Sequence, residues 1–154
     1  MPRFEIVTEI EAPPERCFDL ARDRDLHVES MAHTGERAVA GRTTGLIGPD
    51  EQVTWHGRHF GIQHEHTALI TAFYRPRHFR DEMIRGRFKR FVHDHWFEVT
   101  PHGTRMRDGL EFASPLGWLG SLVDLVIMGR YLERLLRERG LVIKRHAERP
   151  VRRG

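Results

Sequence analysis

The sequence predicts an α+β fold in which a curved antiparallel sheet wraps around one long C-terminal helix. Three observations predict it. A strand-like N-terminal stretch is followed by two short helical segments, about six further strand-like stretches are separated by turn signals, and the longest helical pattern comes last. Sequential strands joined by short turns pair with their neighbours, and a strongly twisted sheet of that size curls. We expect the helix to lie in the curl, which is a helix-grip arrangement with a space between helix and sheet.

The first stretch, residues 4–11, alternates apolar and polar residues, which is typical of a strand with one wet face. Ala12-Pro13-Pro14 ends it, and Pro14 opens a short helix that a second helical segment follows at residues 25–31. The later strand-like stretches are residues 35–40, 51–60, 62–74, 78–85, 88–100 and 104–113. Gly and Pro residues separate most of these stretches, so we expect hairpin connections between them.

The long helix is predicted from residue 115 to about residue 140, because its apolar residues recur at i, i+3, i+4 and i+7. Ser114 can supply the N-cap oxygen, and Pro115 suits the first helical position. Gly140 offers a C-cap, with helix resuming over residues 141–147. The helix is apolar over more than one stripe, so we expect a curved partner surface around it.

The nearly apolar part of this helix, Leu116 to Met128, spans 13 residues and carries Asp124. A helix that crosses a bilayer needs about 20 apolar residues, so we expect no membrane span. The length of 154 residues fits one domain over residues 1–148, with a basic tail over residues 149–154 that we expect to fray.

Charge and cysteine content exclude other classes. The net charge is only +3, and the arginines are spread among acidic residues, so we expect no nucleic-acid partner. The single Cys17 allows no internal disulfide, and no secretory signal pattern follows Met1. The expected location is therefore the cytoplasm.

An ordered set of short motifs carries a family resemblance. The motifs are Phe79-x-Asp81, Gly86-x-Phe88, His93-x-His95-x-Phe97, Thr104-x-Met106-x-Asp108 and Pro115-Leu116-Gly117, followed by a Leu-rich helix with Arg139. This set resembles the SRPBCC superfamily, which includes START domains, Bet v 1-like allergens and polyketide cyclase/dehydrase proteins. The resemblance covers nearly the whole chain, with a departure at Arg87, where the family more often has Pro. It implies a helix-grip fold around a cavity for a hydrophobic small molecule, and it does not establish catalysis.

Four polar residues fall on apolar strand faces, where an unpaired polar group costs about 1 to 3 kcal/mol. His93 and His95 share a face with Phe91 and Phe97, while Asp81 and Asp108 each lie between apolar residues. We expect all four side chains to point into the cavity. Two interpretations remain open, because a His paired with an Asp on a neighbouring strand can serve structure or general acid/base catalysis.

Metal binding is a third interpretation of this His-x-His pair. Strand parity puts Glu98 on the opposite face from His93, although Asp81 or Asp108 could complete a two-His, one-carboxylate set. We expect no bound metal and no cofactor. A second pair, His64 and His66, has polar neighbours and is predicted to lie on the surface.

The sequence therefore predicts a cavity that binds a hydrophobic or aromatic small molecule. Its predicted lining consists of Trp55, His59, Phe79, Asp81, Met83, Phe88, Phe91, His93, His95, Phe97, Met106, Asp108, Leu110 and Phe112. One alternative is a cyclase or dehydratase that uses the cavity His and Asp residues for acid/base catalysis. Another is a regulatory or protein-interaction domain, which an exposed apolar patch would favour. The oligomeric state stays open.

Overall fold

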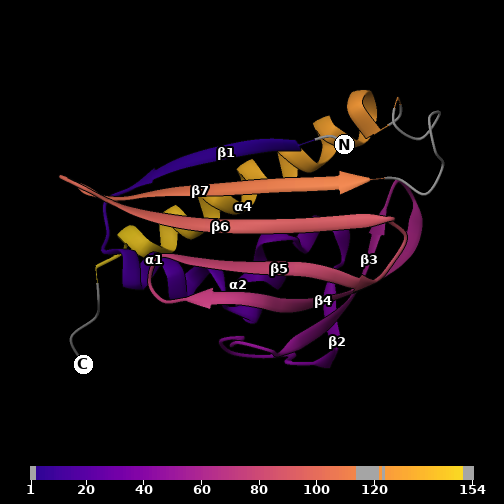
Figure 1. Ribbon diagram of the computed structural model, residues 1–154, viewed down its shortest axis with the longest axis horizontal. Helices are drawn as coiled ribbons and strands as arrows, with labels where there is room; N and C mark the ends of the chain where they lie inside the picture. The colour runs from indigo at the N-terminus through magenta and orange to yellow at the C-terminus, as the bar shows by residue number, and fades with distance from the viewer. Residues whose placement is uncertain (1–2, 114–121, 123, 151–154) are drawn as a thin grey trace.

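The computed structural model describes residues 3–113, 122 and 124–150, and it has the predicted helix-grip architecture. Its strands form one curved antiparallel sheet in the order β1-β7-β6-β5-β4-β3-β2, with the C-terminal helix α4 across the concave face (Figure 1). The strands are β1 (Arg3–Ile10), β2 (Arg37–Gly41), β3 (Gln52–His59), β4 (Ile62–Tyr74), β5 (His78–Arg85), β6 (Arg90–Thr100) and β7 (Gly103–Ala113). The first strand, β1, pairs antiparallel with the last one, β7, and forms one edge of the sheet.

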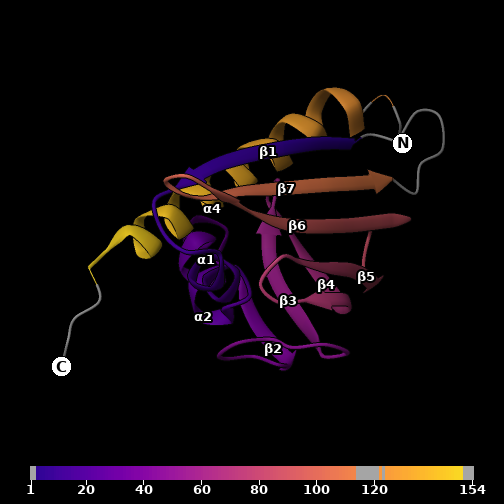
Figure 2. The ribbon, with the colours of Figure 1, turned by 60° about the vertical axis from the view of Figure 1, so that its left-hand side comes forward.

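The helices lie on the same side of the sheet. They are α1 (Pro14–Ala21), α2 (Arg24–Ser30), the short 3-10 turn η1 (Ala32–Thr34), the π-helical turn η2 (Asp124–Met128) and α4 (Gly129–Glu148). Asp23 caps α2, since its carboxylate accepts hydrogen bonds from the backbone N–H groups of Asp25 and Leu26. Both short helices pack against α4 (Figure 2). The predicted helix start at Ser114 and Pro115 lies outside the described residues.

The predicted C-cap at Gly140 was wrong, because α4 runs without a break from Gly129 to Glu148. A side chain at Gly140 would put its Cβ 2.7 Å from Thr8 Oγ1 on β1. The glycine therefore permits close approach of helix and sheet and does not end the helix. A sequence pattern cannot distinguish these two uses of glycine when the contact comes from a strand 132 residues earlier in the chain.

The space between the sheet and α1 is filled by aromatic side chains around Phe18 of α1. This filled region is called the closed end of the helix-grip below. The Phe18 ring is fully buried, and its centroid lies 5.3, 5.2 and 5.3 Å from those of Phe73, Phe79 and Phe97. A second apolar cluster, with Phe112 at its centre, lies between β1, β7 and α4. These two clusters hold the helix against the sheet and leave the region between them for the cavity described below.

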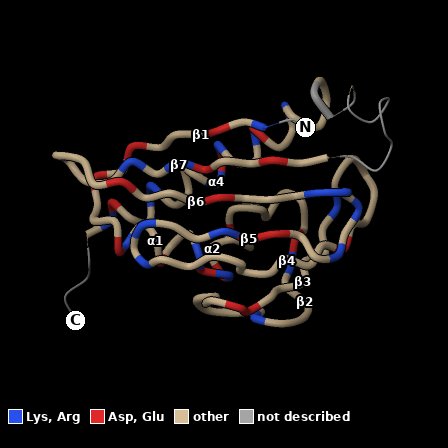
Figure 3. The backbone as a smooth tube through the Cα atoms, viewed as in Figure 1, with Lys and Arg blue, Asp and Glu red and all other residues tan. Residues whose placement is uncertain are grey.

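The outer face carries charges of both signs. Basic and acidic residues are interspersed over the strands (Figure 3), and some pair across neighbouring strands, as Arg90 and Glu111 do at 2.7 Å. None of the described helices is both long enough and apolar enough to cross a membrane.

Candidate functional site

A cavity of about 180 Å³ lies between α4 and the concave face of the sheet. Two strands line it, mostly with alternate residues: Val53, Trp55, Gly57 and His59 on β3, and His64, Glu65, His66, Ala68 and Ile70 on β4. The alternation follows from strand geometry, in which every second side chain points to the same face of the sheet. Since a cavity of about 150 Å³ accommodates benzene, this one has room for at least one aromatic ring.

Three helical segments, α2, η2 and α4, contribute further lining residues. The helix α2 contributes Arg24, His27 and Met31, which stand at i, i+3 and i+7 and so share one helical face. The residues that η2 and α4 contribute are Met128, Tyr131, Leu132, Leu135, Leu136 and Arg139. The leucines make the α4 part of the wall largely apolar, whereas β5 and β6 contribute the ionisable groups Asp81, His93 and His95.

The structure divides the predicted lining residues into two groups. Eight border the cavity, namely Trp55, His59, Asp81, Phe88, Phe91, His93, His95 and Leu110. Six do not border it, namely Phe79, Met83, Phe97, Met106, Asp108 and Phe112. Phe79, Phe97 and Met106 belong to the core around Phe18, and Phe112 belongs to the second apolar cluster. Strand parity placed these residues on the correct face, but α1 and α4 decide which part of that face is filled.

The prediction that His64 and His66 lie on the surface was wrong, because both border the cavity. His66 is half-buried, and its ring packs edge-on against that of Phe91 at 5.1 Å between centroids. Their polar neighbours Gln63 and Glu65 are exposed, and these two residues give the stretch its surface-like composition. Two later residues of the same parity, Ala68 and Ile70, are buried and could have indicated that the histidines point inward.

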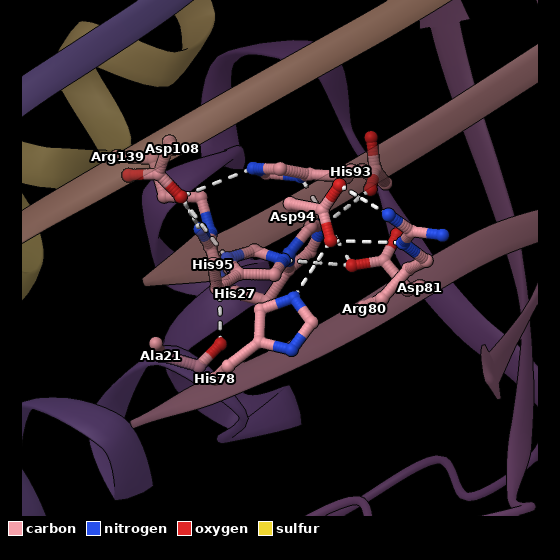
Figure 4. A network of polar contacts seen from close by, with 11 residues as sticks. Ala21, His27, His78, Arg80, Asp81, His93, Asp94, His95, Asp108 and Arg139 are labelled. Atoms are coloured by element: carbon pink, nitrogen blue, oxygen red, sulfur yellow. Dashed lines mark hydrogen bonds and ion pairs between the residues drawn. The ribbon is translucent and has the colours of Figure 1, made fainter. Parts of the chain in front are cut away.

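The four polar residues singled out in the sequence form one cluster (Figure 4). His95 Nε2 lies 2.7 Å from Asp81 Oδ2, and His93 Nε2 lies 3.0 Å from Asp108 Oδ1. The two imidazole rings are 3.7 Å apart between centroids. His95 Nδ1 also lies 3.0 Å from Asp108 Oδ1, but the two atoms are not aligned for a hydrogen bond, and this buried nitrogen has no partner among the described residues. The cluster therefore has one unsatisfied polar atom at its centre.

Burial and charge shift the ionisation of this cluster. Burial opposes ionisation of both carboxyl groups, but contacts with His93 and His95 outweigh burial and hold the pKa values of Asp81 and Asp108 well below the ordinary range. Burial, and then the neighbouring His95, lower the pKa of His93. Asp108 is also 3.6 Å from Arg139, whose Nη2 donates a hydrogen bond to the Ala21 carbonyl. The carboxylates are thus ionised at neutral pH.

A second polar group borders the cavity closer to α2. His27 Nε2 lies 2.6 Å from Glu36, and the His27 ring stacks on Trp55 at 4.1 Å. His59 joins this group, with Nε2 3.7 Å from Glu36 and Nδ1 2.6 Å from the Tyr131 hydroxyl on α4. A chain of polar contacts therefore connects α2 to α4 across β3.

Arg24 supplies a buried cation to the cavity. Burial, and then the nearby charge of Arg139, lower the pKa of Arg24 to about 10, so the guanidinium stays charged at neutral pH. Its Nε donates to the Arg22 carbonyl. Among the described residues, no carboxylate oxygen lies within 4.0 Å of the Arg24 guanidinium, although the side chain borders the cavity. This cation is available to an anionic group in the cavity.

Besides His64 and His66, the site residues that sequence reasoning missed include Arg24, His27, Glu36 and Tyr131. A spacing signal existed for α2, because Arg24, His27 and Met31 fall on one helical face. Glu36 precedes a short strand and gives no periodic signal. Tyr131 belongs to the predicted helix, but only the rotation of α4 against the sheet turns it toward His59.

We expect the free energy of unfolding to decrease when the pH is lowered from about 7.5 to about 5.5. Burial lowers the pKa of His27 against the opposing effect of Glu36, and burial also lowers the pKa of His66. In the unfolded chain both residues take up a proton near their ordinary pKa of about 6.5, so below that pH the unfolded state binds more protons and stability is lost. Urea denaturation at the two pH values measures the change.

Below about pH 4.5 we expect a second loss from Glu36. Burial opposes its ionisation, but the interactions with His27 and His59 hold its pKa well below the ordinary value, so protonation favours the unfolded chain. A His27→Gln variant should show a weaker decrease between about pH 7.5 and 5.5, while His56→Gln on the outer face should not. A wild-type stability that is constant over that interval would contradict this account.

The fold is shared with solved structures of low sequence identity. The Zhui aromatase/cyclase from Streptomyces sp. R1128 has a TM-score of 0.76 at 14% identity, with 99% of this chain and 96% of that chain covered. A protein from Thermus thermophilus has a TM-score of 0.73 at 20% identity, with 96% and 100% covered. Ginseng major latex-like protein 151 from Panax ginseng has a TM-score of 0.69 at 14% identity, with 96% and 98% covered.

No protein-family model matches the sequence, and no curated protein matches it. The structural likeness confirms the predicted resemblance at the level of the fold, which is that of Bet v 1-like and polyketide cyclase-like proteins.

Proposed function

We propose that this chain, with its Bet v 1-like helix-grip fold, binds a small aromatic or alicyclic molecule that carries an anionic oxygen. The observation that carries the proposal is the composition of the cavity wall. Leu132, Leu135 and Leu136 of α4 face a floor of ionisable groups on β5 and β6. Apolar walls supply affinity at about 25 cal/mol per Å² of area removed from water, and a few polar groups orient the ligand.

Arg24 is the residue that favours a negatively charged ligand. Its guanidinium borders the cavity, and among the described residues no carboxylate lies within ion-pair distance of it. A buried cation without a carboxylate partner is costly, and an anionic oxygen from the ligand would offset that cost. A carboxylate or phenolate attached to a ring therefore suits this cavity better than a neutral hydrocarbon.

The test uses naphthoate, an aromatic carboxylate, and naphthalenemethanol as its neutral counterpart. By calorimetry, naphthoate should bind the wild-type protein at least about tenfold more tightly, since hydrogen bonds to charged groups contribute about 1.5 to 3 kcal/mol. Ala68→Phe places a ring in the cavity and should abolish binding. Leu132→Phe on α4 is the second variant, should Ala68→Phe not fold.

The matched control is Leu141→Phe, on the exposed face of the same helix, which should bind naphthoate like the wild type. Thermal unfolding of each variant shows whether it is folded. Binding that is unaffected in a folded Ala68→Phe protein would place the ligand elsewhere. Equal affinity for the two compounds would contradict the proposal that Arg24 binds the anionic oxygen of the ligand.

A second candidate function is an acid/base enzyme of the cyclase or dehydratase type. The observation that favours it is the pairing of His93 with the buried Asp108 and of His95 with the half-buried Asp81 beside the cavity, because a carboxylate fixes the tautomer of an imidazole. Native mass spectrometry of the purified protein separates the two functions. A co-purifying molecule supports binding, whereas an empty protein that converts a carbonyl compound supports the enzyme.

A further inference from the structure

We propose that Asp81, His93 and His95 form a binding site for a divalent first-row transition-metal ion at the floor of the cavity. One donor atom from each of these residues lies within 4.8 Å of the other two. Two imidazoles and one carboxylate are the ligand set of many catalytic zinc and non-haem iron sites. The proposal is independent of which organic molecule the cavity binds, because metal binding is measured without that molecule.

The distances are close to those that a metal ion requires. Asp81 Oδ2 lies 2.7 Å from His95 Nε2 and 4.0 Å from His93 Nδ1. Two ligands of one ion, each bound at about 2.1 Å, stand roughly 3.0 to 3.4 Å apart. Side-chain shifts of less than about 1 Å would therefore bring the three atoms into coordination distance. The three residues come from the neighbouring strands β5 and β6, which hold their backbones in register.

Asp108 provides a carboxylate that can accept a hydrogen bond from the second ring nitrogen of each metal-binding histidine. Its Oδ1 lies 3.0 Å from His93 Nε2 and 3.0 Å from His95 Nδ1, which are the nitrogens left over when the other two ring nitrogens bind an ion. Metal-binding histidines usually donate their second N–H to such a carboxylate. The buried His95 Nδ1, which has no aligned partner among the described residues, would gain one through a small rotation of the ring.

The charge around the site is compatible with a cation. The guanidiniums of Arg24 and Arg139 carry two positive charges that would repel a bound cation. The carboxylates of Glu36, Asp81 and Asp108 carry three negative charges, so the net charge of this group is −1. A divalent ion with one bound hydroxide or one anionic ligand oxygen brings this group to neutrality. The anionic ligand argued from Arg24 has the required charge.

The site also has an open side. Asp81, His93 and His95 border the cavity, whereas Asp108 lies behind them. An ion held by three protein ligands keeps a position for water or a substrate oxygen, as catalytic sites do and closed structural sites do not. A bound ion would polarise that oxygen as a Lewis acid.

The experiment titrates Co²⁺ into chelator-treated protein and records the visible absorption of the bound ion, with Zn²⁺ as the competitor. We expect one bound ion per chain and displacement by Zn²⁺. Asp81→Asn and His93→Gln should each abolish this absorption. Asp108→Asn should weaken the affinity by about 10- to 100-fold, since it removes the carboxylate behind both histidines. Circular dichroism establishes that each variant is folded.

The matched control is His78→Gln. His78 pairs with Asp94 at 2.7 Å across the same two strands, but on the convex face and without a second histidine at the carboxylate. This variant should bind Co²⁺ like the wild type. No saturable binding by the wild-type protein, or equal binding by a folded Asp81→Asn protein, would overturn the proposal. Because no organic ligand is present, either result would leave the naphthoate experiment unaffected.

Discussion

Replacement of Arg139 by methionine is expected to lower the free energy of unfolding by about 3 kcal/mol. Arg139 is buried on α4, its Nη1 lies 3.6 Å from Asp108, and its Nη2 donates a 2.6 Å hydrogen bond to the Ala21 carbonyl. Methionine has a similar length but no charge, so Asp108 would lose its cationic neighbour and the Ala21 carbonyl its donor. Loss of one partner from a buried ion pair costs about 3 to 5 kcal/mol. We expect the lower end because His93 and His95 still contact Asp108.

Denaturant unfolding at neutral pH measures this change, and Arg137→Met is the control on the same helix. Arg137 is exposed and pairs with Glu133 at 2.8 Å, an arrangement that contributes at most about 0.5 kcal/mol. Equal stability of the Arg139→Met and wild-type proteins would show that the charge of Asp108 does not need a cation. The His–Asp cluster would then be held by its histidines alone.

Phe18→Ala is expected to destabilise the protein by about 3 to 5 kcal/mol, the usual cost of deleting a buried aromatic ring. The Phe18 ring is the common neighbour of Phe73, Phe79 and Phe97. Its removal would leave a cavity between α1 and the sheet, and Phe79 also stacks on His95 at 4.1 Å. The closed end of the helix-grip would loosen next to the polar cluster.

Phe18→Leu should recover part of the loss, because it refills some of that space. Tyr74→Ala is the matched control. Tyr74, next to Phe73 on β4, is 69% exposed, so the loss of its ring should cost less than about 1 kcal/mol. Thermal and urea unfolding compare the variants. A Phe18→Ala protein as stable as Tyr74→Ala would mean that α1 is not part of the cooperative core.

Strand parity in the sequence predicted much of the site. His93, His95 and Asp81 border the cavity because residues of one parity share one face of the sheet. The same rule could not separate His93 and His95 from Phe97, which has the same parity on the same strand, β6. That distinction depends on Phe18, which comes from α1 and covers only one end of the concave face.

Other features depended on contacts between distant parts of the chain. The sequence predicts a helix end at Gly140, whereas the glycine lets α4 approach Thr8 on β1. The polar neighbours of His64 and His66 predict a surface position for them, yet both histidines border the cavity. Glu36 acquires its role from His27 and His59, which are brought to it by α2 and β3.

The sequence by itself determined the helix-grip architecture, the element order and the inward face of most strands. These follow from local periodicity, which depends on backbone geometry and on the alternation of apolar and polar residues. The tertiary structure alone decided where the concave face is filled and where it is hollow, and which ionisable groups meet there. Both depend on how α1, α2 and α4 are positioned against the sheet, and that position is set by packing among side chains that are far apart in the sequence.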